Sequence, residues 1–87
     1  MLKREEIKQV LDCPSKHLLE LSLELVNLKD KERSAIELVD IKGNTEERAS
    51  EMLNISRNSI QNYRRKAYNK FAKVWDNQPL IKQILEY

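Results

Sequence analysis

The chain contains little cysteine, glycine or proline and no long apolar run. Its 87 residues include one cysteine (Cys13), one glycine and two prolines. A single cysteine excludes an intramolecular disulfide framework and a cysteine-rich zinc site, and it favours a reducing compartment. No apolar stretch approaches the roughly 18 residues that span a bilayer, and the opening MLKREEIKQV lacks the apolar core of a signal peptide. We therefore expect a cytoplasmic protein that does not enter a membrane.

The scarcity of helix breakers predicts the fold class. Leu, Glu, Lys, Gln, Arg and Ala dominate, and alternating runs of β-branched residues are missing. These features predict one compact all-α domain over residues 1–87, with four to six short helices and no room for a large enclosed active site. The chain offers no carboxylate pair, no nucleophile with its base and no glycine-rich phosphate loop, so we expect neither enzymatic activity nor a cofactor. His17 has no cysteine or histidine companion, which argues against a metal site.

Apolar residues at helical spacing mark the outer segments. Residues 2–11 predict a weakly amphipathic helix, and the leucine-rich segment 15–28 predicts a second helix with a wide apolar face. Near the C-terminus, residues 79–87 place Leu80, Ile81, Ile84 and Leu85 on one face. Segments 15–28 and 79–87 fit two interpretations: they close the core, or they form a dimer interface.

A third helix is predicted after these leucines. Asp30 is its expected N-cap, and the apolar residues that follow as far as Ile41 supply its buried side. Gly43 and Asn44 are expected to end it, since both residue types tolerate the conformations that stop a helix.

The charge of the chain is unevenly distributed. Residues 1–53 carry nine Lys or Arg against twelve Asp or Glu, a balance of −3, whereas residues 54–75 carry six basic residues and no acid. Residues 76–87 carry one base against two acids, a balance of −1. A solvated helix face usually mixes signs, so a one-signed segment favours a polyanion as partner. The alternative is an exposed helix that is basic without function.

The segment 45–72 has the pattern of a helix-turn-helix. Thr45 can cap a short helix whose first turn carries two glutamates. Asn54 tolerates a left-handed conformation, Ile55 is an apolar plug, and Ser56 can cap the longer helix that follows. A helix of about nine residues, a three-residue turn and a longer helix form this motif.

The second helix of the motif, residues 57–72, separates its residue types by face. Ile60, Tyr63, Ala67, Phe71 and Val74 recur at spacings of three and four and should face the core. Arg reads guanine, and Asn or Gln reads adenine, so the polar face suits base contacts in the major groove. The predicted base contacts are Arg57, Asn58, Gln61, Asn62 and Arg65. The predicted phosphate contacts are Thr45, Ser56, Ser59, Arg64, Lys66, Lys70 and Lys73.

These residues resemble the DNA-binding fourth region of bacterial sigma factors and its relatives among phage and bacterial regulators. The resemblance covers about residues 18–72. It is carried by Leu28, Glu32, Arg33, the apolar helix to Ile41, Gly43, Thr45, Leu53, Ile55, Ser56, Arg57, Ser59, Ile60 and the trailing RRKA. It implies that residues 57–66 enter the major groove of promoter DNA. Because regions like the other parts of a sigma factor are missing, we expect a small regulator with a DNA-binding domain that resembles the fourth region of sigma factors.

Double-stranded DNA is therefore the expected partner, with RNA polymerase and a second copy of the chain as further candidates. Most proteins with this motif read two half-sites about one helical turn apart, which favours a homodimer. Two other functions fit the pattern. One is the DNA-recognition subunit of a phage packaging terminase, which recognises packaging sites. The other is a helical adaptor that binds a protein through its leucine-rich helix.

Overall fold

The computed structural model describes residues 1–86, which form helices and no strand. The elements are α1 (Arg4–Leu11), α2 (Lys16–Glu24), α3 (Asp30–Ala35), the π-helical η1 (Ile36–Ile41), α4 (Glu46–Leu53), α5 (Arg57–Val74) and α6 (Pro79–Leu85). The predicted all-α class is confirmed. In this described part of the chain, no helix is both long and apolar enough to cross a membrane.

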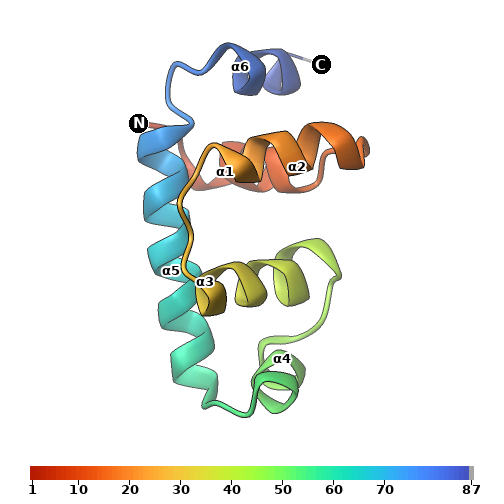
Figure 1. Cartoon of the computed structure of the whole chain (residues 1–87), viewed down its shortest axis with the longest axis vertical. Helices are drawn as coiled ribbons and strands as arrows, with labels where there is room; N and C mark the ends of the chain where they lie inside the picture. The colour runs from red at the N-terminus through yellow and green to blue at the C-terminus, as the bar shows by residue number, and fades with distance from the viewer. Residues whose placement is uncertain (87) are drawn as a thin grey trace. The chain divides into compact units, whose positions relative to one another are not determined.

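The helices group into two compact units, and α5 contributes to both (Figure 1). The first unit contains residues 1–27 and those from 68 onward, which include α1, α2, the C-terminal part of α5, and α6. The second unit contains residues 28–67, which include α3, η1, α4 and the N-terminal part of α5. The chain passes between the units twice, once between residues 27 and 28, in the segment that joins α2 to α3, and once between residues 67 and 68, inside α5. The predicted single domain over residues 1–87 stays a prediction.

Aromatic side chains of α5 and of the turn after it lie at the centre of the first unit. Phe71 and Trp75 are both fully buried and stack with their ring centroids 4.2 Å apart. The indole Nε1 of Trp75 donates a hydrogen bond to the carbonyl oxygen of Ser22, 2.8 Å away, so the one polar atom of this ring is satisfied. Tyr68 is also buried, and the guanidinium of Arg4 lies 5.1 Å from its ring centroid. Trp75 was not predicted as a core residue, although it follows Phe71 at helical spacing.

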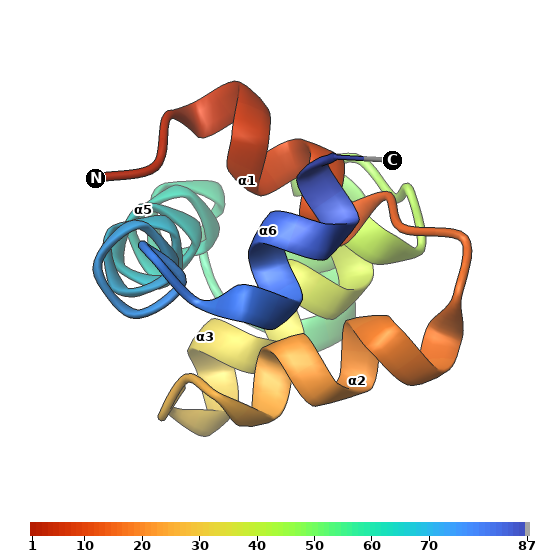
Figure 2. The ribbon, with the colours of Figure 1, turned by 90° about the horizontal axis from the view of Figure 1, so that it is seen from above.

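Helices α1, α2 and α6 supply the aliphatic part of the same core. Figure 2 shows α1 and α6 close together, in agreement with the contacts between them. Their buried aliphatic residues, with those of α2 and the turn after it, are Ile7, Val10, Leu11, Leu19, Leu23, Val26, Ile81 and Ile84. Segments 15–28 and 79–87 thus contribute buried residues to the core, as one of their two interpretations requires. Leu21 and Leu25 remain 37% and 41% exposed.

The leucine-rich helix is shorter than predicted. Ser15 caps it, accepting a hydrogen bond from the backbone N–H of Leu18, and the helix ends at Glu24 rather than near residue 28. The backbone N–H of Val26 bonds to the carbonyl of Leu23, a tighter i→i+3 turn that ends the helical register. Leucines continue beyond this turn, which is why apolar spacing alone overextended the helix.

The third predicted helix ends after Ile41 as expected, with Gly43 left-handed at φ 79°, but its first residue and its helix type differ from the prediction. Asp30 is the first helical residue rather than the cap, and the preceding backbone N–H of Lys29 donates to the Glu32 carboxylate at 3.1 Å. After Ala35 the helix changes to η1, where the Lys42 N–H bonds to the carbonyl of Glu37. Apolar spacing over so few residues cannot distinguish an i→i+4 from an i→i+5 pattern.

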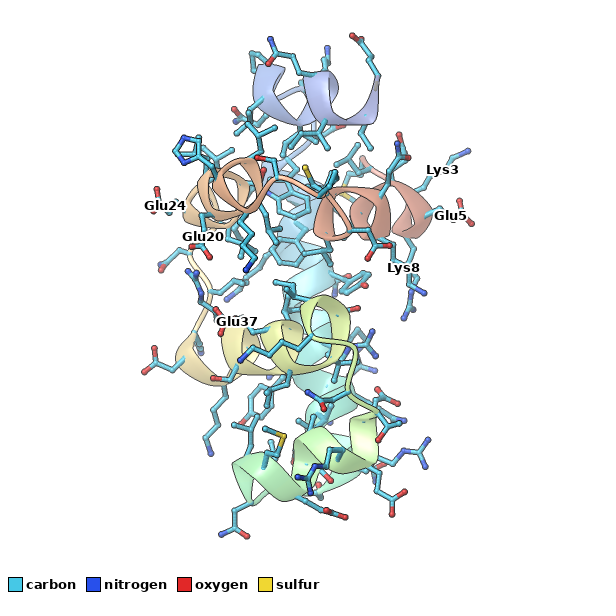
Figure 3. All side chains as sticks on the ribbon, turned by 90° about the vertical axis from the view of Figure 1, so that its right-hand side faces the viewer. Lys3, Glu5, Lys8, Glu20, Glu24 and Glu37 are labelled. Carbon is cyan, nitrogen blue, oxygen red and sulfur yellow. The ribbon has the colours of Figure 1, made fainter. Side chains whose placement is uncertain are left out.

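Charged side chains outside α5 mix their signs, as the sequence indicated. Figure 3 shows Lys3, Glu5 and Lys8 beside α1 and Glu20 and Glu24 on α2, all directed away from the ribbon. Such faces are ordinary solvated surfaces. They contrast with α5, which carries no acid along its whole length.

The second unit has its own apolar cluster beneath the turn between α4 and α5. Its buried members are Ala35, Leu38, Ala49 and Ile60, and the half-buried Val39, Leu53, Ile55 and Tyr63 pack against them. Ile60 is fully buried and Ala67, farther along the same helix, is too. The predicted apolar face of α5 is thus confirmed over its N-terminal half.

This packing predicts the effect of truncating Ile60. Ile60→Ala should lower the free energy of unfolding by about 2 to 5 kcal/mol, because it removes buried methyl groups and leaves a cavity under the turn. Met52→Ala is the control, since Met52 is 52% exposed on α4, and it should cost less than about 0.5 kcal/mol. Urea denaturation of both variants measures the difference. Equal stability of Ile60→Ala and the unsubstituted protein would contradict the assigned core.

Candidate nucleic-acid interface

The chain from α4 to α5 forms the predicted succession of helix, three-residue turn and helix. Thr45 caps α4 by accepting a hydrogen bond from the Arg48 N–H at 3.0 Å. Asn54 is left-handed, with φ 56° and ψ 46°, and Ser56 accepts a hydrogen bond from the Ser59 N–H at 3.1 Å. The three local roles assigned to Thr45, Asn54 and Ser56 are therefore confirmed. That this pair of helices binds DNA stays a prediction.

The predicted base-reading side chains share the exposed face of α5. All five are exposed: Arg57, Asn58, Gln61, Asn62 and Arg65. The opposite side of the same turns packs into the apolar cluster through Ile60 and Tyr63. One side of the helix is thereby anchored, and the other presents donors and acceptors to whatever lies outside it.

Four of these five side chains have a polar or charged neighbour in the protein. The guanidinium of Arg65 donates to the amide oxygen of Asn62 at 2.8 Å. The amide Nε2 of Gln61 donates to Glu46 Oε1 at 3.3 Å, and the same oxygen lies 4.0 Å from a guanidinium nitrogen of Arg57. The face is therefore partly preorganised by contacts within α5 and by an acid at the start of α4.

Arg64, a predicted phosphate contact, is engaged in an ion pair within the protein. Its Nε and Nη2 donate to the two carboxylate oxygens of Asp40 at 2.9 and 2.8 Å, and its Nη1 donates to Glu46 Oε2 at 3.0 Å. The Arg64 side chain is only 15% exposed, and that of Asp40 only 7%. A guanidinium engaged on all three nitrogens by two carboxylates is an internal ion pair. The sequence did not reveal this pairing, because residue type does not show which side chains a cation contacts.

The other predicted phosphate contacts divide between the two units. In the second unit, Lys66, Thr45 and Ser56 are exposed and Ser59 is half-buried. The hydroxyl oxygens of Ser56 and Ser59 lie 2.9 Å apart, so one donates to the other. In the first unit, Lys73 is exposed. Lys70, also in that unit, is half-buried, and its ammonium donates to the carbonyl oxygen of Asn27 at 3.4 Å.

Asp40 and Glu46 are the acidic residues of the candidate interface whose pairing with Arg64 the sequence did not reveal. Glu46 was expected only to favour the positive end of a helix dipole, and Asp40 was assigned no role. The available signal was compositional: a basic arginine near the buried face of α5 requires an acidic partner, because a buried unpaired charge is costly. Which acids supply that partner depends on how η1 and α4 pack against α5.

Comparison with protein families, curated proteins and solved structures finds no match to this chain. Within residues 1–86, no group of three or more His, Cys, Asp or Glu side chains could hold a metal ion.

The reassignment of Arg64 predicts a difference between two adjacent arginines. Arg64→Ala should lower the free energy of unfolding by about 2 to 4 kcal/mol, because it leaves the carboxylates of Asp40 and Glu46 without their cation. Arg65→Ala removes the same charge from the exposed face and should cost less than about 0.5 kcal/mol. Guanidinium chloride denaturation compares the two. If the two variants lost similar amounts of unfolding free energy, the ion pair of Arg64 would not stabilise the fold.

Proposed function

We propose that this protein is a sequence-specific DNA-binding transcriptional regulator that reads the major groove with the N-terminal turns of α5. One observation carries the proposal. The five side chains best suited to base recognition are all exposed on one face of a helix whose opposite face is buried in a core. A reading helix requires both properties, since it must reach the bases and hold its position while doing so.

The chemistry of this face suits base edges. A major groove about 12 Å wide admits an α-helix, and each base pair presents a distinct pattern of donors and acceptors there. Arginine pairs with guanine through two hydrogen bonds, and asparagine or glutamine pairs with adenine in the same way. The face carries two arginines, Arg57 and Arg65, and three amides, Asn58, Gln61 and Asn62. It can therefore discriminate between base pairs.

Hydroxyls and a lysine beside this face are suited to the phosphate backbone. Lys66 is exposed one residue after Arg65 and can neutralise a phosphate. Thr45 uses its oxygen as an acceptor in the α4 cap, so its hydroxyl hydrogen can be donated outward. Within the Ser56 and Ser59 pair only one hydroxyl hydrogen is used. The second can be donated to phosphate.

A single reading helix contacts few base pairs, so the proposal includes a homodimer on two half-sites about one helical turn apart. Binding-site selection from random duplexes tests both parts. Enrichment of one sequence supports specific DNA binding, and a palindrome supports the dimer. Failure of the unsubstituted protein to bind any duplex near 50 mM salt would contradict the proposed function, because phosphate contacts are strongest at low salt.

Base reading predicts a selective loss. Alanine in place of Arg57 or Asn58 should weaken binding to the selected site by about 1 to 3 kcal/mol and affect a random duplex much less. Titration of labelled specific and random duplexes with each variant measures both affinities. A parallel fall in the two would show that these side chains do not read bases.

Phosphate contact by Lys66 predicts a uniform loss instead. Lys66→Gln should weaken binding to all duplexes and reduce the slope of log affinity against log salt by about one unit. Lys8→Gln on α1 is the matched control, because Lys8 is exposed near the acids Glu5 and Asp12 and the substitution removes an equal charge. Titrations at several salt concentrations compare the slopes. Equal slopes for the two variants would show that Lys66 does not contact phosphate.

A further inference from the structure

Glu46 joins the internal ion pair to the exposed face of α5. Its Oε2 accepts from Arg64 at 3.0 Å, and its Oε1 accepts from the Gln61 amide at 3.3 Å. The Glu46 side chain is 21% exposed, so it stands between the packed side of the helix and the outside. One carboxylate thus contacts a fixed cation with one oxygen and a predicted base reader with the other.

The position of this carboxylate is well determined. Arg64 is held by both oxygens of Asp40 at 2.8 and 2.9 Å, in the two-pronged geometry that gives an arginine and a carboxylate a fixed orientation. Glu46 lies in the first turn of α4, directly after the cap Thr45. Both ends of the Glu46 side chain are therefore restrained, the backbone by the helix cap and the carboxylate by Arg64.

The contact between Glu46 and Gln61 decides which end of the amide faces outward. An ionised carboxylate only accepts hydrogen bonds, so the amide nitrogen of Gln61 must face Glu46. The amide oxygen and the second N–H of the same nitrogen are then left for an outside partner. An acceptor beside a donor is the pattern with which glutamine pairs with the N6 and N7 positions of adenine.

We infer that Glu46 is a positioning residue that orients Gln61 for the recognition of adenine in the major groove. This inference rests on the proposed DNA-binding function and adds a determinant of its specificity. Glu46 acts through Gln61 and touches no base itself. Orientation before binding lowers the entropic cost of forming the two hydrogen bonds to the base.

The same carboxylate places a negative charge near a polyanion, so its two effects have to be separated. Charge alone predicts that neutralising Glu46 strengthens binding to every duplex. Positioning predicts that the preference for the selected site falls as well. Glu47 provides the matched control, because it is the next residue of α4, carries the same charge and is exposed.

The experiment compares Glu46→Gln, Glu47→Gln, Gln61→Ala and the double variant Glu46→Gln with Gln61→Ala. Affinities are measured for the selected duplex, for duplexes with single base-pair changes and for a random duplex. Glu46→Gln should lower the preference for the selected adenine about tenfold, a typical value for one paired contact. Glu47→Gln should leave that preference unchanged. In the Gln61→Ala background, Glu46→Gln should lower it by less than about twofold, since the oriented side chain is absent.

A second measurement tests the orientation without DNA. The ¹⁵N relaxation of the Gln61 side-chain amide reports its mobility in the free protein, and its order parameter should fall in Glu46→Gln and not in Glu47→Gln. Thermal melting confirms that the variants are folded. An unchanged order parameter, or an equal loss of preference with and without Gln61, would overturn the inference. Failure of the unsubstituted protein to bind duplexes would instead refute the proposed function, and with it the adenine-reading role, while the relaxation data still decide the orientation.

Discussion

The ion pair between Arg64 and the carboxylates of Asp40 and Glu46 is the interaction on which the arrangement of the second unit depends. It joins three successive elements, since Asp40 belongs to η1, Glu46 to α4 and Arg64 to α5. A partly buried charge is unfavourable without a partner of opposite charge. Removing one of these three side chains therefore leaves the remaining charges partly buried and less well compensated. The packing of the apolar cluster beneath the turn is not directional. The hydrogen bonds of the ion pair are directional, and they therefore constrain the relative orientation of the three elements.

This pairing also changes the electrostatic description of α5. Six basic residues lie between positions 54 and 75, yet they do not form one uniform basic surface. Arg64 is neutralised internally, Arg57 lies 4.0 Å from Glu46, and Lys70 donates to a backbone carbonyl. Less positive charge is therefore directed outward than the count indicates. In the proposed function, specific contacts by amides and arginines consequently carry a larger share of binding than general attraction to phosphate.

Local chemistry made much of the fold predictable from sequence. The caps at Thr45 and Ser56 and the left-handed Asn54 could be predicted because each depends on residue type and near neighbours. Helix ends without such a signal were less predictable. The end of α2 at Glu24 is an example, since leucines continue past it and apolar spacing does not record where the backbone turns.

The sequence by itself determined the helical class, the succession from α4 through the turn to α5, and the apolar face of α5. These follow from propensity, capping and a repeat of three to four residues, all of which act within a few positions of the chain. Only the tertiary structure decided that Arg64 is an internal cation and that Glu46 contacts Gln61. Those pairs join residues 18 and 15 positions apart on different helices. Their formation depends on how the helices pack in space, which no local pattern of residues encodes.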